Sequence, residues 1–120
     1  MPEPLMCPSA PAHEGAILLG IRLGERTLGY ASRRVTVDRA FVDGAGPEPE
    51  QRYRFAAPCR QHGCGNWTGG DCGLVARFTE RLDAVTDTLP RCSIRADCRW
   101  FAQRGRAACA VCPQVRNPGR

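Results

Sequence analysis

The sequence predicts an α+β protein in which a small antiparallel N-terminal sheet is followed by a loop-rich, metal-stapled helical C-terminal half. Three observations support this class: short apolar or alternating runs before residue 44, one amphipathic stripe after residue 72, and seven of the eight cysteines from residue 59 onward. A length of 120 residues indicates a single domain with a modest core. Within residues 1–120 we distinguish a strand-rich lead-in, 1–51, from a cysteine-rich metal-binding half, 52–120.

The sheet is expected in the first part of the chain. Residues 1–14 are rich in proline and are expected to form an irregular segment. Residues 16–43 predict a hairpin or a small meander, because two apolar runs are followed by alternating apolar and polar positions. Gly20 and Gly29 interrupt this pattern and indicate bulges or sharp twists in the strands.

The middle of the chain is expected to be mostly loop. Residues 44–51 form an acidic, turn-rich break between the two halves. Residues 52–58, "RYRFAAP", predict a short edge strand, and the glycine-rich segment 59–72 is incompatible with a helix.

A single amphipathic helix is the clearest element that the sequence predicts. Its apolar stripe has the 3–4-residue spacing of one helix face and consists of Leu74, Phe78, Leu82, Val85 and Leu89. Asp71 is expected to cap its start and Pro90 to end it. We expect this helix to be a scaffold that packs its stripe in the core and exposes its charged face.

Two shorter helical segments are expected after Cys92. The run "ADCRWFAQRG" predicts a short helix ending at Gly105, and residues 106–115 predict a further turn. The last five residues, 116–120, are expected to be frayed.

The location of the protein decides how its cysteines are interpreted. The N-terminus has no basic segment followed by an apolar one, and no apolar run approaches the roughly 18 residues of a membrane helix. We therefore expect a cytoplasmic protein with no membrane contact. Thiols stay reduced in the cytoplasm, so cysteines in this number favour metal ligation or redox chemistry over disulfides.

The eight cysteines divide into two sets by chain order. One set consists of Cys92, Cys98, Cys109 and Cys112. The other consists of Cys59, Cys64 and Cys72 and lacks a fourth member, for which Cys7 is the favoured candidate and His62 the alternative. Cys7 is favoured because a proline follows it, as one follows Cys112, and because the count then gives two sets of four.

The spacing of these cysteines favours iron–sulfur clusters over zinc. Only Cys109 and Cys112 form a Cys-x2-Cys pair, whereas a four-cysteine zinc site normally uses two such pairs. Each thiolate of a 4Fe-4S cluster binds its own iron, so irregular spacing is tolerated, and a proline after the last ligand is frequent in bacterial ferredoxins. We expect one or two 4Fe-4S clusters, with zinc as the alternative metal.

Positive charge is concentrated around the last four cysteines. Residues 1–90 carry ten Arg against eleven acidic residues, a net charge of −1, whereas residues 91–120 carry seven Arg against one acidic residue, a net charge of +6. One interpretation is that the arginines neutralise a buried anionic cluster; the sharper one is docking to an acidic protein or to nucleic acid. The candidates for neutralisation are Arg91, Arg95, Arg99, Arg104 and Arg106.

Two further features of the sequence favour iron–sulfur clusters. Trp67 and Trp100 each lie close in sequence to one cysteine set, where a large apolar side chain excludes water from a cluster. The run of Cys92, Cys98, Arg99–Phe101, Gly105 and Cys109–Pro113 resembles small uncharacterised cysteine-rich proteins of bacteria for which iron–sulfur clusters have been suggested. The resemblance extends over roughly the last 60 residues and implies cluster binding without an assigned reaction.

The sequence contains no local signature of an independent enzyme. His13 and His62 are far apart in the chain, and neither a phosphate-binding loop nor a dinucleotide fingerprint is present. We therefore expect an accessory iron–sulfur protein that passes electrons to an acidic redox partner. The alternatives are a zinc-stabilised protein-interaction module and a redox-sensing regulator that binds nucleic acid, the latter not favoured.

Overall fold

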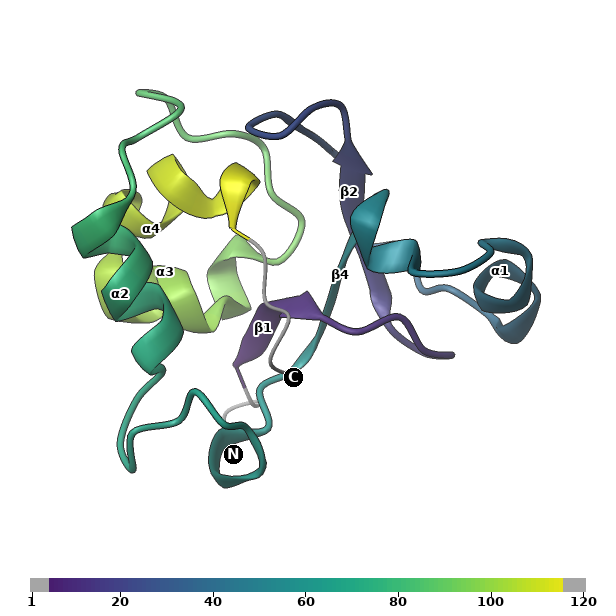
Figure 1. The fold of residues 1–120 in the computed structure, drawn as a ribbon, viewed down its shortest axis with the longest axis horizontal. Helices are drawn as coiled ribbons and strands as arrows, with labels where there is room; N and C mark the ends of the chain where they lie inside the picture. Colours follow the sequence, from purple (N-terminus) through teal and green to yellow (C-terminus); the bar gives the residue numbers. More distant parts are fainter. Residues whose placement is uncertain (1–4, 116–120) are drawn as a thin grey trace.

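The computed structural model describes residues 5–115, which form a four-stranded antiparallel sheet and several short helices (Figure 1). The strands are β1 (Met6–Ala10), β2 (Ile17–Arg22), β3 (Leu28–Tyr30) and β4 (Tyr53–Pro58). Their order across the sheet is β1-β4-β2-β3. The expected α+β class, with an antiparallel sheet formed mainly by the N-terminal half, is confirmed.

Two expectations about the strands are wrong. β4 was expected at an edge but pairs with both β1 and β2, so it lies inside the sheet. β1 lies in the segment that was expected to be irregular. It is an edge strand, where the missing N–H of Pro8 is tolerated, and its register shifts between Cys7 and Ala10. Proline content therefore did not exclude a strand here.

The bulge indicated by Gly20 is present. The pairing of β2 with β4 shifts its register between Leu18 and Gly20. A Cβ atom at Gly20 would lie 2.6 Å from the carbonyl oxygen of Gly29, which is closer than any side chain allows. Glycine at this position therefore lets β2 and β3 approach each other.

The strand pattern expected up to residue 43 ends early in the structure. Thr36 makes only an isolated bridge with Ile17, and the chain then forms helix α1 (Arg39–Gly44). The Asp38 side chain accepts a hydrogen bond from the N–H of Phe41 at 2.8 Å and caps this helix. This local cap favours the helical turn over continued strand pairing.

Helix α2 (Gly73–Arg81) is shorter than the amphipathic pattern predicts. Its first residues follow Cys72, while the Asp71 carboxylate accepts a hydrogen bond from Thr68 Oγ1 at 2.8 Å instead of capping the helix. Beyond Arg81 the chain leaves the helix, and the N–H of Val85 donates to the carbonyl of Ala110 at 2.8 Å. The hydroxyl of Thr86 bonds locally, which competes with the helical backbone pattern.

The two C-terminal helical segments are confirmed. α3 (Arg99–Arg104) and α4 (Arg106–Val111) are separated by Gly105, whose φ of 61° is readily adopted by glycine. The expectation of fraying at 116–120 falls outside the described residues. The 3₁₀ turns of the chain are η1 (Pro49–Gln51), η2 (Gln61–Gly63), η3 (Arg95–Asp97) and η4 (Cys112–Gln114).

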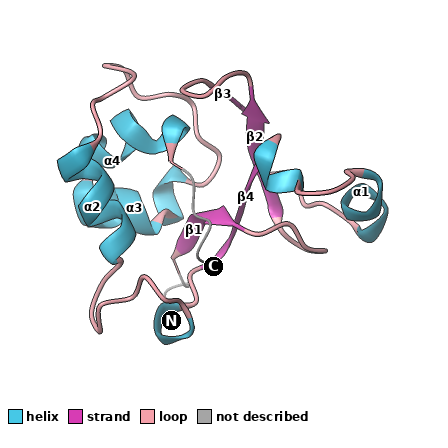
Figure 2. Cartoon of the chain, in the orientation of Figure 1, coloured by secondary structure: helices cyan, strands magenta, loops and turns pink. Residues whose placement is uncertain are grey.

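The sheet has a hydrophobic cluster on each face. On one face, α1 packs against Tyr53 and Phe55 of β4 through Phe41 and Val42. The other face is covered by α2, α3 and α4, which gather on one side of the molecule (Figure 2). The larger cluster lies on this side; its most buried members are Leu19, Ala56, Val75, Ile94, Trp100, Ala108 and Val115.

A contact between the chain start and α3 completes the helical side of the molecule. Met6 of β1 forms a parallel bridge with Cys98, the residue that precedes α3. The edge strand that carries Cys7 is thereby held beside the helices that carry the C-terminal cysteines.

Candidate functional site

The eight cysteines line two hollows, with four cysteines around each. None of the eight, all within residues 5–115, is in a disulfide; Cys72, Cys98 and Cys112 are buried and the others are half-buried. The first hollow is lined by Cys7, Cys59, Cys64 and Cys72. The second hollow is lined by Cys92, Cys98, Cys109 and Cys112. These are the two sets of four that chain order indicated with Cys7 as the fourth member; their role as ligands remains a prediction.

The first hollow brings together residues from the sheet and from the glycine-rich loop. Cys7 lies on β1 opposite Ala57 of β4, and Cys59 follows β4, where its N–H donates to the carbonyl of Leu5 at 2.8 Å. Cys64 follows η2, and Cys72 immediately precedes α2. Four cysteines distant in sequence therefore face a space of about 350 Å³, its open mouth included.

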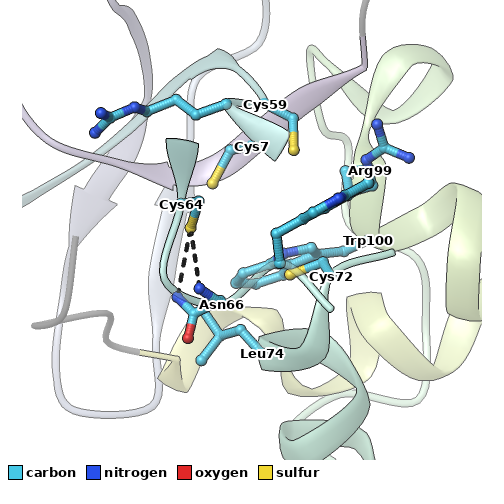
Figure 3. A pocket seen from close by; sticks show the side chains of 10 residues that line it. Cys7, Cys59, Cys64, Asn66, Cys72, Leu74, Arg99 and Trp100 are labelled. Atoms are coloured by element: carbon cyan, nitrogen blue, oxygen red, sulfur yellow. Dashed lines mark hydrogen bonds between the residues drawn. The ribbon is translucent and has the colours of Figure 1, made fainter. Parts of the chain in front are cut away.

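The walls of the first hollow are shown in Figure 3. Cys7, Cys59 and Cys64 lie on one side, and Cys72, Arg99 and Trp100 lie on the other. The loop is folded back on itself by a bridge between Trp67 and Cys72. The backbone N–H of Asn66 lies 3.4 Å from the Cys64 sulfur, so that a thiolate at Cys64 has a donor beside it (Figure 3).

The second hollow is formed mainly by the C-terminal helices. Cys98 precedes α3, Cys109 lies in α4 and Cys112 begins η4, with Cys92 in the preceding loop. The space between them measures about 320 Å³, its open mouth included. Pro8 of β1 and Tyr30 of β3 complete the wall on the sheet side, together with four residues of the helical side: Arg95, Trp100, Phe101 and Ala108.

Burial favours the neutral form of three groups at the second hollow: Cys92, Cys98 and Tyr30. It raises the pKa of the Cys98 thiol to about 12 and also raises the pKa of Cys92. Burial and the nearby Cys112 sulfur raise the pKa of the Tyr30 hydroxyl. A bound metal centre reverses this balance, because its positive charge favours the thiolate form of its ligands.

Several buried N–H groups at the hollows lack an acceptor. Among residues 5–115, four buried side-chain nitrogen or oxygen atoms have no hydrogen-bond partner, and three of them belong to residues that line the hollows. These are Nε1 of Trp67 and Nε of Arg99 at the first hollow, and Nε of Arg95 at the second. Each is a donor. Each of these three N–H groups therefore lacks the partner that a buried donor normally has.

A buried arginine adjoins the second hollow. Arg54 of β4 is only 2% exposed, and its guanidinium donates to the carbonyls of Pro8 and Cys112 and to the Cys112 sulfur at 3.3 Å. The ion pairs among residues 5–115 are Arg34–Asp97 and Arg39–Asp43, so Arg54 has no carboxylate partner there. The Cys112 sulfur is thus one of the acceptors that surround this buried guanidinium.

Arg54 was not predicted as a site residue, although the sequence contains a signal for it. In "RYRF" the side chains of Tyr53 and Phe55 share one face of β4, which places Arg54 on the opposite face. That face is buried by the C-terminal helices, and a lone arginine there requires a specific partner. The burial of Arg54 could be inferred only when β4 was known to lie inside the sheet.

The other candidates occupy different positions. His62 is exposed, its ring lies 6.1 Å from that of Trp67, and it is not among the residues that line either hollow. Arg95 and Arg99 line the hollows, and the guanidinium of Arg99 lies 4.9 Å from the centre of the Trp67 ring. The other three arginines considered for neutralisation are exposed: Arg91, Arg104 and Arg106.

The arrangement differs from that of a single-ion site. Within residues 5–115, no group of three or more His, Cys, Asp or Glu side chains is placed to hold one metal ion.

No helix within residues 5–115 is long and apolar enough to cross a membrane. Comparison of the sequence with family models and curated proteins, and of the fold with solved structures, finds no match in any of the three.

Proposed function

We propose that this chain is a small iron–sulfur protein that binds a 4Fe-4S cluster in each hollow and passes electrons to a partner enzyme. The observation that carries this proposal is the composition of the two hollows. Each is lined by four cysteines and by a residue whose buried N–H group has no acceptor. Four thiolates are the ligand set of a 4Fe-4S cluster, and hydrogen bonds to the sulfurs are part of how a protein tunes it.

The alternative metal, zinc, fits these hollows less well. Zinc–sulfur bonds are about 2.3 Å long, so four sulfurs on one zinc lie within about 4 Å of one another. Among residues 5–115, no three His, Cys, Asp or Glu side chains are placed to hold one metal ion, although four cysteines line each hollow. A cluster binds one iron for each thiolate, and its inorganic sulfides add acceptors for the N–H groups of Trp67, Arg95 and Arg99.

The chain's own residues then have distinct roles. The eight cysteines hold the two centres, which supply one-electron chemistry when bound. Arg54 balances the negative charge at Cys112, and the rings of Trp67 and Trp100 exclude water. A reducing, cytoplasmic location is consistent with eight cysteines that are outside disulfides.

An acidic redox protein is the proposed partner. Arg91 precedes Cys92, and Arg106 lies in the same helix as Cys109. Both arginines are exposed, as is Arg104 at the end of α3. Positive charge is thus presented next to two cysteines of the second hollow, where an acidic surface can dock close to an electron-transfer centre.

Metal analysis of oxygen-free protein tests the proposal. We expect about eight iron atoms and about eight acid-labile sulfides per chain, a brown colour and broad absorption at about 400 nm. A colourless protein that contains stoichiometric zinc and no iron would instead indicate a zinc-stabilised interaction module. A folded protein that contains neither metal would overturn the proposal.

A further inference from the structure

The two hollows share a wall. The indole of Trp100, which is 2% exposed, lines both of them. In β1, Cys7 lines the first hollow and Pro8 lines the second. In the same way, Cys98 lines the second hollow and Arg99 the first. Two short segments therefore contribute neighbouring residues to opposite sides of one partition.

The partition is a fixed part of the fold. Its two segments are joined by the parallel bridge between Met6 and Cys98. Arg54 connects the same parts, because its guanidinium lies 5.8 Å from the centre of the Trp100 ring and donates to the carbonyl of Pro8 at 2.8 and 3.0 Å. Trp100 is therefore held in position by contacts from the sheet as well as from its own helix.

The partition is also thin. Consecutive Cα atoms are about 3.8 Å apart, so Cys7 and Pro8, or Cys98 and Arg99, bring the two hollows to within about one residue of each other. The buried ring of Trp100 stands between the two hollows at this point. This spacing allows electrons to pass directly from one centre to the other.

We infer that the two hollows form one two-centre unit in which an electron crosses the Trp100 partition between the clusters. This inference rests on the proposed function. In the exchange, a reduced 4Fe-4S centre of charge 1+ is oxidised to 2+ while its neighbour is reduced from 2+ to 1+. One electron moves, no bond forms or breaks, and neither a proton nor a third reactant is required.

Magnetic interaction between the clusters provides the first test. The anaerobic holoprotein is reduced stepwise with dithionite and followed by electron paramagnetic resonance. We expect a simple signal when about half of the clusters are reduced, and a split or broadened signal at full reduction, because two neighbouring centres are then paramagnetic. Additive, unsplit signals from a protein with about eight iron atoms would overturn the inference and leave the proposed function intact.

Iron content separates the two proposals further. A chain with only about four iron atoms has a single cluster, which overturns the two-centre unit but not iron–sulfur binding. A chain without iron contradicts both. These outcomes are read from the unmodified protein, so they do not depend on a variant that folds.

A pair of tryptophan variants tests the shared wall. Trp100→Phe is expected to change the resonance signals of both clusters, because Trp100 lines both hollows. Trp67→Phe is the matched control. It is expected to change one signal only, because Trp67 lines the first hollow and not the second. A Trp100→Phe protein with both clusters bound and only one signal altered would contradict the shared partition.

Discussion

The guanidinium of Arg54 donates a hydrogen bond to the sulfur of Cys112 at 3.3 Å. The same side chain donates to the Cys112 carbonyl at 2.7 Å and lies over the ring of Trp100. One buried cation of the sheet is thus attached to a cysteine of the second hollow and to the wall between the hollows. This relationship makes the second hollow dependent on β4 for its electrostatics.

Replacement of Arg54 is expected to lower the reduction potential of one cluster. Reduction adds negative charge, and a cation beside a ligand sulfur stabilises the reduced form. Arg54→Gln should therefore shift one of two midpoints in a potentiometric titration to a lower value. Arg26→Gln, an exposed position in the turn between β2 and β3, is the control and should leave both midpoints unchanged. Two unaltered midpoints in Arg54→Gln would remove Arg54 from the site.

The identity of the fourth ligand in the first hollow can be decided with two variants. Cys7→Ala is expected to reduce iron to about half, because Cys7 lines the first hollow with Cys59, Cys64 and Cys72. His62→Ala is the matched control and should retain full iron, because His62 is exposed and lines neither hollow. Iron and sulfide per chain are measured in oxygen-free preparations. The reverse pattern would assign the ligand role to histidine.

The two cysteine sets are expected to lose metal independently. Cys98→Ser should remove about half of the iron by emptying the second hollow, and Cys64→Ser should remove the other half. The double variant should then contain almost none. If either single variant lost all of its iron while remaining folded by circular dichroism, the division into two separate centres would be wrong.

Metal removal is expected to loosen the helical side of the molecule selectively. Without clusters, the donors of Trp67, Arg95 and Arg99 have no acceptors and the loops carrying the cysteines lose their cross-links. Amide hydrogen exchange should accelerate most in residues 59–72 and 92–112. Amides that pair β2 with β4 serve as the internal reference and should change less. Uniform acceleration throughout the chain would indicate that the clusters stabilise the whole fold equally.

Core packing between sheet and helices makes a separate contribution to stability. Leu19 of β2 is 1% exposed and belongs to the larger hydrophobic cluster without lining either hollow. Leu19→Ala is expected to lower the free energy of unfolding by about 2–5 kcal/mol, because it leaves a cavity. Leu23→Ala, at a position that is 68% exposed, should change it by less than about 0.5 kcal/mol. Denaturant unfolding of the anaerobic proteins measures both, and equal effects would contradict this placement of the core.

Local sequence signals predicted the elements whose formation depends on neighbouring residues. The break between α3 and α4 was predicted at Gly105 because glycine readily adopts the positive φ found there. The amphipathic stripe correctly identified Leu74, Phe78 and Leu82 as residues that pack on the core. Where the helix ended was not predicted, because Val85 pairs with Ala110, a residue from a distant part of the chain.

By itself, the sequence determined the thiol chemistry available to this protein and, from chain order, seven cysteines in a set of three and a set of four; the place of Cys7 beside the set of three came from the tertiary structure. The tertiary structure alone decided that β4 lies inside the sheet, that Arg54 contacts Cys112 and that Trp100 stands between both hollows. The reason is physical. The identity and spacing of residues determine local structure over short stretches of the chain. Strand order and the packing of helices on a sheet depend instead on contacts between residues far apart in sequence.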